Sequence, residues 1–273
     1  MSCGDNNKEK SAEMTGTALI TGASSGIGKE FARIHASKKG DVILVARREA
    51  SLIELKNELE AKEGIVAHVM TCDLARAGAT EELFNRVKAA ELKVDILINN
   101  AGFGGAGRHV ERPLADELEM IDLNIKALVP LTHRFAADMT AAGHGRILNV
   151  GSTAGFMPGA LQAVYFATKA FVNSFSQAID QELRGNGVTC TVLTPGYVET
   201  EFAKRSNLED TPLAKNGATA QSAAQYGYDA MLAGDLVAVN ERKLSFAVNW
   251  VIPLLPRRMV LKMTQKMQTK KTG

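Results

Sequence analysis

The sequence predicts an α/β fold, an open doubly wound parallel sheet of six to seven strands with helices on both faces, in a single domain. Three observations lead to it. Short apolar, β-branched runs recur along the chain, segments of helix length separate them, and no long Pro- or Gly-rich linker interrupts the alternation. Near-continuously apolar runs joined through helices are typical of parallel strands that are buried on both faces. Right-handed crossovers then place the helices on the two sides of the sheet.

Each element can be placed along the chain in order. Strands are expected at residues 17–21, 42–45, 65–70, 96–98, 147–150 and 188–193, with a weaker one at 236–239. Helical patterns lie between them at residues 27–38, 49–62, 80–90, 114–142 and 160–184. The polar segment 199–218 has no clear period and suits a lid over a site. We therefore expect a flexible N-terminal extension over residues 1–13, one main α/β domain over 14–240 and a helical C-terminal extension with a basic tail over 241–273.

Composition and charge exclude several classes of protein. Of the 273 residues 45% are hydrophobic and 23% charged, which excludes disorder of the whole chain. The net charge is +2, but six of the 32 basic residues lie in 257–273 with no acid, so residues 1–256 carry 26 basic and 30 acidic side chains, a net −4. A net-negative body has no broad basic face for nucleic acid. The longest apolar stretch, 246–255, is half the roughly 20 residues that span a membrane.

Cysteines and histidines point to no metal or disulfide. Cys3, Cys72 and Cys190 are far apart and lack CxxC spacing. The five histidines show no HExxH or other paired spacing, so no metal is expected. The polar N-terminus has no apolar core of a secretory signal. A reducing cytoplasm is the simplest location.

A glycine-rich turn follows the first expected strand. It reads Thr-Gly-Ala-Ser-Ser-Gly-Ile-Gly over residues 21–28, before a helical pattern. Glycine lets a backbone turn tightly and approach a pyrophosphate, whose charge sits on the free N–H groups at a helix start. A purely structural turn is the alternative, but the first strand of a long alternating pattern is where a Rossmann-like fold places its phosphate loop. The residues expected to bind there are Gly22, Ser24, Ser25, Gly26, Ile27 and Gly28.

Further motifs follow in a fixed order, and together with the GxxxGxG turn they carry a resemblance. They are Cys72-Asp73-Leu74, Asn99-Asn100-Ala101-Gly102, Asn124, Ser152, Tyr165-Phe-Ala-Thr-Lys169, and Pro195-Gly196 with Thr200. In this order the chain resembles the short-chain dehydrogenase/reductase family over residues 14–239. The Leu-Pro-Arg-Arg sequence at 255–258 resembles tails of its DltE-like and hydroxysteroid-type subgroup.

The spacing of Tyr165 and Lys169 makes physical sense by itself. Residues four apart share a helix face, so the Lys169 ammonium can lie near the Tyr165 phenol. Moving a tyrosine pKa from about 10 to near neutrality needs about 3–4 kcal/mol of preferential phenolate stabilisation, which a lysine and an oxidised nicotinamide could supply. Alone, the pair could equally be chance helix neighbours.

The resemblance implies roles for four residues. Tyr165 would be the general acid or base for the substrate oxygen, and Ser152 would stabilise developing charge on that oxygen. Lys169 would bind the nicotinamide ribose and lower the Tyr165 pKa, while Asn124 would hold a water connected to Lys169. Alone, Ser152 could be a turn or helix cap and Asn124 a buried polar helix residue. Asn99 is expected to tie neighbouring strands together.

The end of the second strand predicts the cofactor. NAD-binding folds place a carboxylate there for the ribose 2′-OH, whereas a 2′-phosphate needs a cation. Ala46 stands at the position of the acid and is followed by Arg47 and Arg48, which favours NADP(H). Ser25, where NADP-binding members often have a basic residue, is a departure from the pattern. The two arginines could instead form a solvated helix start, although cations there oppose the helix dipole.

The resemblance also assigns the rest of the cofactor site. Asp73 would accept from the adenine amino group, and Asn100, Ala101 and Gly102 would line a ribose. The nicotinamide end would contact Pro195, Gly196, Val198 and Thr200.

The C-terminal segment has helical spacing. Met259, Met263 and Met267 form one stripe beside Arg258, Lys262, Lys266 and Lys270. Such a helix could lie on an anionic membrane, each cation contributing about 1 kcal/mol. We favour the alternative that the methionines pack on the body or on a second subunit.

These observations predict an NADPH-dependent enzyme that reduces a carbonyl, or oxidises a secondary alcohol, in a small hydrophobic molecule. The residues expected to shape the pocket are Phe103, Phe156, Met157, Leu161 and the lid from Glu199. The alternatives are a redox sensor that binds NADP(H) without turnover and a membrane-surface scaffold. The resemblance implies a homodimer or homotetramer paired through helices 114–142 and 160–184.

Overall fold

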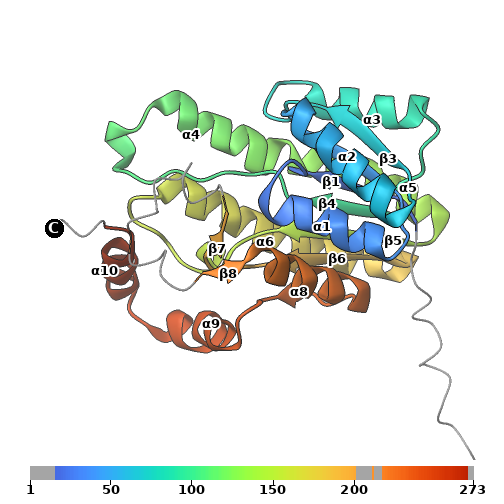
Figure 1. Cartoon of the computed structure of the whole chain (residues 1–273). Coiled ribbons are helices and arrows are strands. Elements are labelled where there is room, and N and C mark those ends of the chain that lie inside the picture. The colour runs from blue at the N-terminus through green and yellow to red at the C-terminus, as the bar shows by residue number, and fades with distance from the viewer. Residues whose placement is uncertain (1–15, 201–210, 212–216, 270–273) are drawn as a thin grey trace, which may run out of the picture.

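The computed structural model describes residues 16–200, 211 and 217–269, and its centre is a parallel sheet (Figure 1). The strand order is β3-β2-β1-β4-β5-β6-β9. The bounds are β1 Ala18–Thr21, β2 Val42–Ala46, β3 Ala67–Thr71, β4 Ile96–Asn99, β5 Gly145–Val150, β6 Val188–Leu193 and β9 Val237–Ala238. From β1 the strand order runs to one edge of the sheet through β2 and β3, and to the other edge through β4, β5 and β6. In open α/β sheets, ligands bind at the carboxyl ends of the strands where the order switches in this way. The predicted doubly wound α/β fold is confirmed.

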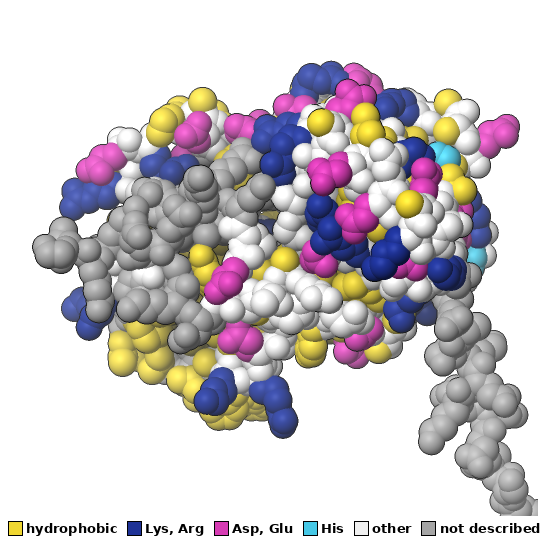
Figure 2. All heavy atoms as spheres, in the orientation of Figure 1, with side chains coloured by type: hydrophobic (Ala, Val, Ile, Leu, Met, Phe, Trp, Pro, Cys, Tyr) yellow, Lys and Arg dark blue, Asp and Glu magenta, His cyan; other side chains and the backbone are white. Residues whose placement is uncertain are grey.

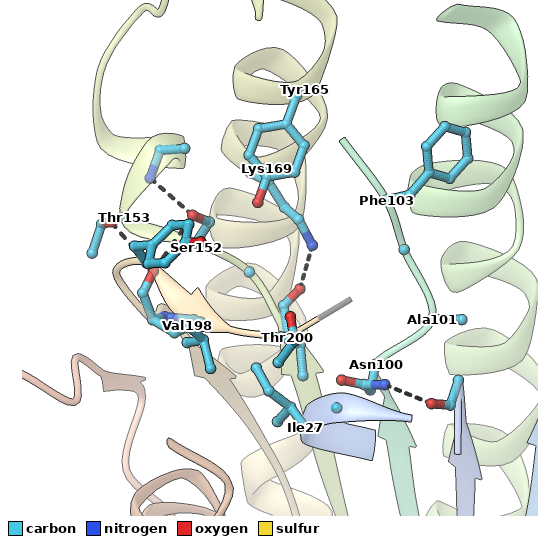
Figure 3. A pocket seen from close by; sticks show the side chains of 18 of the residues that line it. Ile27, Asn100, Ala101, Phe103, Ser152, Thr153, Tyr165, Lys169, Val198 and Thr200 are labelled. Atoms are coloured by element: carbon cyan, nitrogen blue, oxygen red, sulfur yellow. Dashed lines mark hydrogen bonds between the residues drawn. The ribbon is translucent and has the colours of Figure 1, made fainter. Parts of the chain in front are cut away.

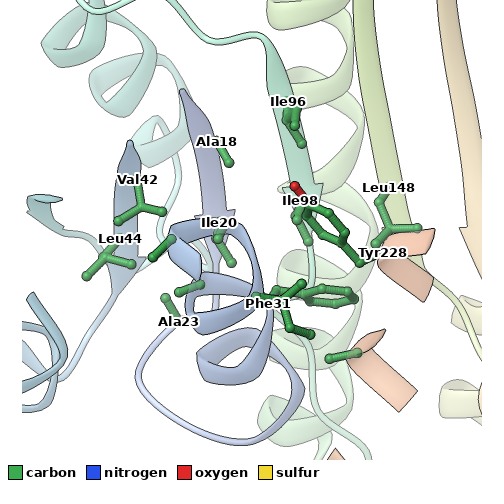
Figure 4. Close-up of a cluster of buried hydrophobic side chains, with 14 of the residues drawn as sticks. Ala18, Ile20, Ala23, Phe31, Val42, Leu44, Ile96, Ile98, Leu148 and Tyr228 are labelled. Atoms are coloured by element: carbon green, nitrogen blue, oxygen red, sulfur yellow. The ribbon is translucent and has the colours of Figure 1, made fainter. Parts of the chain in front are cut away.

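Helices cover both faces of the sheet. α1 (Gly26–Ser37), α2 (Glu49–Glu63) and α8 (Ala220–Ala233) pack on one face, and α3 (Ala79–Ala89), α5 (Leu128–Ala142) and α6 (Ala163–Leu183) on the other. In the first layer Phe31 of α1 and Tyr228 of α8 lie over Ile20 and Ile98 of the sheet (Figure 4). Alternate residues of each strand therefore point into two separate hydrophobic cores, one on each face of the sheet. This explains why the strand sequences are continuously apolar.

The long helix expected at 114–142 is divided. α4 (Leu114–Ile121) leads into a π-helical turn (Asp122–Lys126) before α5 begins. π turns insert one residue into the helical ladder and are frequent at functional sites. The turn contains Asn124, which is 2% exposed and turned toward the cavity-side loop after β4. Helical periodicity alone does not signal such an insertion.

The helix expected at 160–184 begins later, because the chain before it is not helical. Leu161 has a left-handed φ of +69°, and Gln162 is the N-cap of α6 with φ −145°. The carbonyl of Leu161 accepts from Gly107 N at 2.8 Å, which holds this backbone in place.

The described chain after β9, which ends at residue 269, contains helices and turns but no further strand. They are α9 (Arg242–Phe246), a π turn (Ala247–Val251), a 3-10 turn (Ile252–Leu254) and α10 (Arg257–Gln268). α9 and α10 lie at one end of the molecule in Figure 1, away from α3 and α5. Before them, β7 (Val198–Glu199) pairs in parallel with β8 (Ala218–Thr219). Most of the lid predicted at 199–218 lies outside the described residues, as does the N-terminal extension. None of the described helices is long and apolar enough to cross a membrane.

Candidate active site

A cavity of about 780 Å³ opens at the carboxyl ends of β1, β2, β4, β5 and β6. It brings together nearly all the predicted site residues, which come from segments up to 178 positions apart in the sequence (Figure 3). Those on its wall are Gly22, Ser24, Ser25, Gly26, Ile27, Arg47, Arg48, Asp73, Asn100, Ala101, Gly102, Ser152, Tyr165, Lys169, Pro195, Gly196, Val198 and Thr200. Gly28 and Asn124 are not on the wall: Gly28 packs against Gly22, and Asn124 accepts a hydrogen bond from the backbone of Phe103.

The glycine turn has the geometry of a phosphate cradle. Gly22 and Gly26 have φ values of +67° and +55°, which favour glycine. A Cβ on Gly28 would lie 2.3 Å from the Gly22 carbonyl oxygen, so Gly28 lets α1 approach the turn closely. The N-cap Ser25 makes no side-chain cap, and no acid occupies the first turn of α1. The N–H groups at this positive helix end are therefore suited to an anion such as a pyrophosphate.

The loop after β4 is tied to the same turn. Asn100 Nδ2 donates to Thr21 O at 3.0 Å, and the backbone N–H groups of Asn100 and Ala101 both donate to Thr21 Oγ1 at 3.0 Å. These bonds hold Asn100 and Ala101 against the phosphate cradle. Thr21, the first residue of the glycine-rich turn, thus links the two loops.

Two arginines, Arg47 and Arg48, follow β2 directly and line the cavity. Arg48 Nη2 donates to Ser24 Oγ at 3.3 Å, and Arg47 Nη1 lies 3.3 Å from Glu119 Oε1 of α4. Ala46 leaves the wall here without the acid that a free 2′-OH would need. Asp73, at the next strand end, lines the same part of the cavity. The residues present therefore fit NADP(H).

Tyr165 and Lys169 both project from α6 into the cavity, and the Tyr165 hydroxyl points toward Ser152 (Figure 3). Lys169 Nζ donates to Val150 O at 2.7 Å and lies 5.9 Å from the centroid of the Tyr165 ring. Burial lowers the pKa of Lys169 to about 8. Burial also raises the pKa of Tyr165 to about 12, and a hydrogen bond with Ser152 opposes that rise. The phenol is therefore protonated at neutral pH, as a proton donor must be.

Ser152 is held by a network from α6. Asn173 Nδ2 donates to Ser152 O at 3.0 Å, Ser152 N donates to Asn173 Oδ1 at 3.5 Å, and Ser152 Oγ accepts from Ala154 N at 3.1 Å. Ser152 therefore does cap a turn, as considered from the sequence, and it also lies on the cavity wall. Asn173, 3% exposed, is a positioning residue that the motifs did not reveal.

Asn124 and Asn99 connect structural elements. Asn124 exchanges hydrogen bonds with the backbone of Phe103 and donates to Thr168 Oγ1 at 3.1 Å. Its water-binding role stays a prediction. Asn99 Nδ2 donates to Asn149 Oδ1 of β5 at 2.9 Å, as expected of a residue that ties two strands.

The part of the cavity expected to hold the substrate differs from the sequence prediction. Phe103 and Met157 line it, but Phe156 and Leu161 do not. Leu161 instead sets the left-handed backbone before α6. The missed wall residues are Leu123, Gln162, Tyr197, Leu244, Ala247, Ile252, Met263, Thr264, Met267 and Gln268. Seven of these come from the C-terminal segment, whose amphipathic spacing signals a buried face but not what that face covers.

α10 packs back on the body of the molecule. Its buried stripe is Val260, Thr264 and Gln268, at 2%, 4% and 5% exposed, and Thr264 Oγ1 donates to Pro158 O at 3.4 Å. Met263 and Met267 flank that stripe and reach the cavity, while Met259 is more than half exposed. The predicted methionine stripe is therefore divided between the cavity and the surface. Lys270, predicted as part of the basic stripe, lies outside the described residues.

Comparisons with known proteins show which family the chain belongs to. The family model described as short chain dehydrogenase matches residues 16–211. Sulfoacetaldehyde reductase 2 of Chromohalobacter salexigens is 39% identical over 191 residues, 69% of this chain and 75% of that protein. The NADP-dependent 3-hydroxy acid dehydrogenase YdfG of Escherichia coli is 38% identical over 187 residues, 68% and 74% of the two chains. A short-chain dehydrogenase from Sphingobium yanoikuyae, solved with NADPH, superposes with a TM-score of 0.80 at 28% identity, covering 93% of this chain and 98% of that one. The chain belongs to the short-chain dehydrogenase/reductase family.

Proposed function

We propose that the protein is an NADPH-dependent oxidoreductase that reduces the carbonyl of a hydrophobic small molecule, or oxidises the corresponding secondary alcohol. One observation carries this: Tyr165, Ser152 and Lys169 line the same cavity as the glycine turn, so a proton donor and a dinucleotide site share one space. This complete set of groups for turnover disfavours a redox sensor.

NADP(H) is the cofactor that the wall residues and the relatives both support. Arg47, Arg48 and Ser24 would hold the 2′-phosphate, and the N-terminus of α1 the pyrophosphate. One relative is named as NADP-dependent, and one similar structure was solved with NADPH. When bound, the nicotinamide supplies or accepts the hydride.

The side chains account for the movement of the proton. Tyr165, protonated at neutral pH, donates its proton to the carbonyl oxygen, while Ser152 hydrogen-bonds that oxygen as its charge develops. Lys169, anchored on Val150 O, provides the cation that stabilises the resulting phenolate. In alcohol oxidation the same phenolate removes the hydroxyl proton.

The substrate end of the cavity favours an apolar compound. Its described wall includes Phe103, Met157, Leu244, Ile252 and Met263. Pockets of this kind select substrates through buried apolar area and a few polar groups that fix orientation.

A substrate screen that follows NADPH absorbance tests the function. Bulky apolar ketones should be reduced faster with NADPH than with NADH, and Tyr165→Phe should abolish turnover while NADPH still binds. A panel in which only small hydrophilic carbonyls react would contradict the substrate class. No turnover of any carbonyl would favour the sensor.

The C-terminal segment also supports contact with an anionic membrane surface. The apolar side chains of Phe246, Trp250 and Leu254 are 63%, 69% and 83% exposed. Hydrophobic side chains gather over α9 and the following turns, with basic ones at the margin (Figure 2). Residues 242–268 contain six Lys or Arg and no acid, so a second copy facing this surface would meet like charge, whereas anionic lipid would attract it.

Vesicle sedimentation tests this contact. Vesicles with phosphatidylserine should bind the protein, added salt should weaken binding, and Trp250→Ser with Leu254→Ser should reduce it. Trp250 is the only tryptophan, so its fluorescence should shift to the blue on binding. Val110→Ser with Leu114→Ser, at 89% and 66% exposed, is the matched control. Equal binding by both double variants would overturn the contact.

A homodimer or homotetramer is proposed from the family. α6 carries a stacked pair, Phe171 and Phe175, with ring centroids 5.6 Å apart and Phe171 39% exposed, which suits a subunit contact. Light scattering should therefore give a mass above that of one chain, and Phe171→Glu should lower it. The cytoplasmic location stays a prediction.

A further inference from the structure

The cavity wall holds two buried carboxamides whose oxygen atoms have no partner. Gln162 and Gln268 are 3% and 5% exposed, both line the cavity, and Oε1 of each lacks a hydrogen bond. Within the described part of the chain, no other residue on this wall has a buried side-chain atom without a partner. Native structures rarely leave a buried polar atom unpaired unless a ligand or water satisfies it.

Gln162 is placed by an unfavourable backbone conformation. Leu161 before it has φ +69°, a left-handed conformation that costs free energy for a leucine. The hydrogen bond from Gly107 N to Leu161 O holds it. As a result α6 begins with Gln162 at its N-cap, three residues before Tyr165. Gln162 and Tyr165 thus lie one turn apart in the sequence and line the same cavity.

Gln268 arrives from the opposite end of the sequence. It is the third member of the buried stripe of α10, after Val260 and Thr264. The hydrogen bond from Thr264 to Pro158 O docks α10 on the loop that leads to Gln162. Two segments that are more than 100 residues apart thus each contribute one carboxamide to the same cavity.

The chemistry of these groups defines what they bind. A carboxamide offers an acceptor oxygen and two N–H donors but no charge. The neighbouring described wall residues Met157, Ile252, Met263 and Met267 are apolar. The Lys and Arg side chains on the described wall are Arg47 and Arg48 near the glycine turn and Lys169 beside Tyr165. An uncharged polar group is therefore matched better than a carboxylate or a sulfonate.

We propose that Gln162 and Gln268 bind a second, uncharged polar group of the substrate, a hydroxyl or an amide, on an otherwise apolar ketone. This rests on the proposed function, because it concerns the substrate of that same site. Tyr165 and Ser152 engage the carbonyl, and the two glutamines engage the second group, which fixes the orientation of the ketone.

The test compares pairs of ketones with equal chain length, one ending in a methyl group and the other in a hydroxyl group at the same position. Across a series of lengths, wild type should show a maximum in kcat/KM for one hydroxy ketone over its partner. Gln268→Leu keeps the side-chain volume and should lower that selectivity about 3- to 10-fold, mainly through KM, as expected for one lost neutral hydrogen bond. Gln162→Leu should do the same.

A matched control lies on the same helix. Gln265 is exposed on the outer side of α10, and Gln265→Leu should leave the selectivity at the wild-type value. Melting temperatures show whether each variant is folded. Selectivity that is equal in wild type, Gln268→Leu and Gln162→Leu would overturn the proposal, as would a wild type without preference at any length.

A binding measurement separates this proposal from the reductase function. In Tyr165→Phe loaded with NADPH, calorimetry should show the hydroxy ketone binding more tightly than its methyl partner, and adding Gln268→Leu should remove the difference. If wild type reduces no ketone but this binding preference is present, the glutamine site stands and the reductase function fails. If ketones are reduced but neither assay shows a preference, the glutamine site fails alone.

Discussion

The carboxamide of Asn124 and the backbone of Phe103 form a reciprocal pair of hydrogen bonds, at 3.1 Å from Phe103 N to Oδ1 and 3.0 Å from Nδ2 to Phe103 O. Phe103 lines the cavity, and Asn124 lies in the π turn between α4 and α5. The side chain of Asn124 thus acts as a clamp that fixes the loop after β4 at the active site.

Asn124→Ala should loosen this clamp. Both Phe103 backbone groups would lose a buried partner, at about 1–3 kcal/mol each. We expect urea unfolding to show a loss of at least about 2 kcal/mol, together with a lower kcat. Asn186→Ala, in an exposed turn, is the control and should leave stability nearly unchanged. Unchanged stability of Asn124→Ala would show that the loop is held elsewhere.

Ala46→Asp should reverse the cofactor preference. The new carboxylate would repel a 2′-phosphate held by Arg47 and Arg48 and would accept hydrogen bonds from a free 2′-OH. Losing one charge-assisted interaction is worth about 1.5–3 kcal/mol, so kcat/KM for NADPH should fall about 10-fold or more while that for NADH rises. Steady-state kinetics with both cofactors measure this. If NADPH is used as well as before, the arginines do not bind the 2′-phosphate.

Alcohol oxidation should accelerate as the pH rises. That direction requires the Tyr165 phenolate, and burial raises the Tyr165 pKa to about 12 in the absence of cofactor. A bound oxidised nicotinamide and Lys169 favour the phenolate, so the midpoint of the kcat/KM profile should lie below this value. Lys169→Met removes one cation and should move the midpoint to higher pH. A profile that is flat from neutral to alkaline pH would exclude Tyr165 as the base.

The buried pair His35 and Tyr228 should make stability depend on pH. His35 Nε2 lies 2.7 Å from Gly16 O, a group that only accepts, so Nε2 carries the proton and Nδ1 accepts from Tyr228 Oη at 2.7 Å. Burial lowers the pKa of His35. In the unfolded chain His35 binds a proton near pH 6.5, whereas in the folded protein it stays neutral to lower pH. The free energy of unfolding should therefore fall as the pH drops below about 6.5.

Thermal melting between pH 7.5 and 5.5 checks this prediction. His35→Asn should be less stable than wild type at pH 7.5 and should lose less on acidification. The surface variant His133→Asn should follow wild type. Parallel curves for His35→Asn and wild type would mean that another group carries the pH dependence.

Local sequence patterns were sufficient to predict the sheet and to select the residues around the glycine turn that the structure brings together in one cavity. The Gly22 turn, Asn100 and the Tyr165 to Lys169 spacing each require a particular backbone or helix face, so their residue types reveal their positions. In the part of the cavity expected to hold the substrate, Phe103 and Met157 were predicted correctly, but the residues from the C-terminal segment were missed because tertiary contacts bring them there. Amphipathic spacing shows that α10 buries a face, but the contact with Pro158 that brings Gln268 into the cavity leaves no mark in local sequence. The left-handed backbone of Leu161 could not be predicted either, because leucine rarely adopts a positive φ.

The C-terminal wall of the cavity has a consequence for how this protein can diverge. The family model ends at residue 211, whereas Leu244, Ile252, Met263 and Gln268 lie beyond it. Substitutions there can change the shape of the substrate chamber without touching the sheet, the glycine turn or the proton donor. The residues that support the proposed reaction and those that shape the proposed substrate pocket can therefore change independently in this chain.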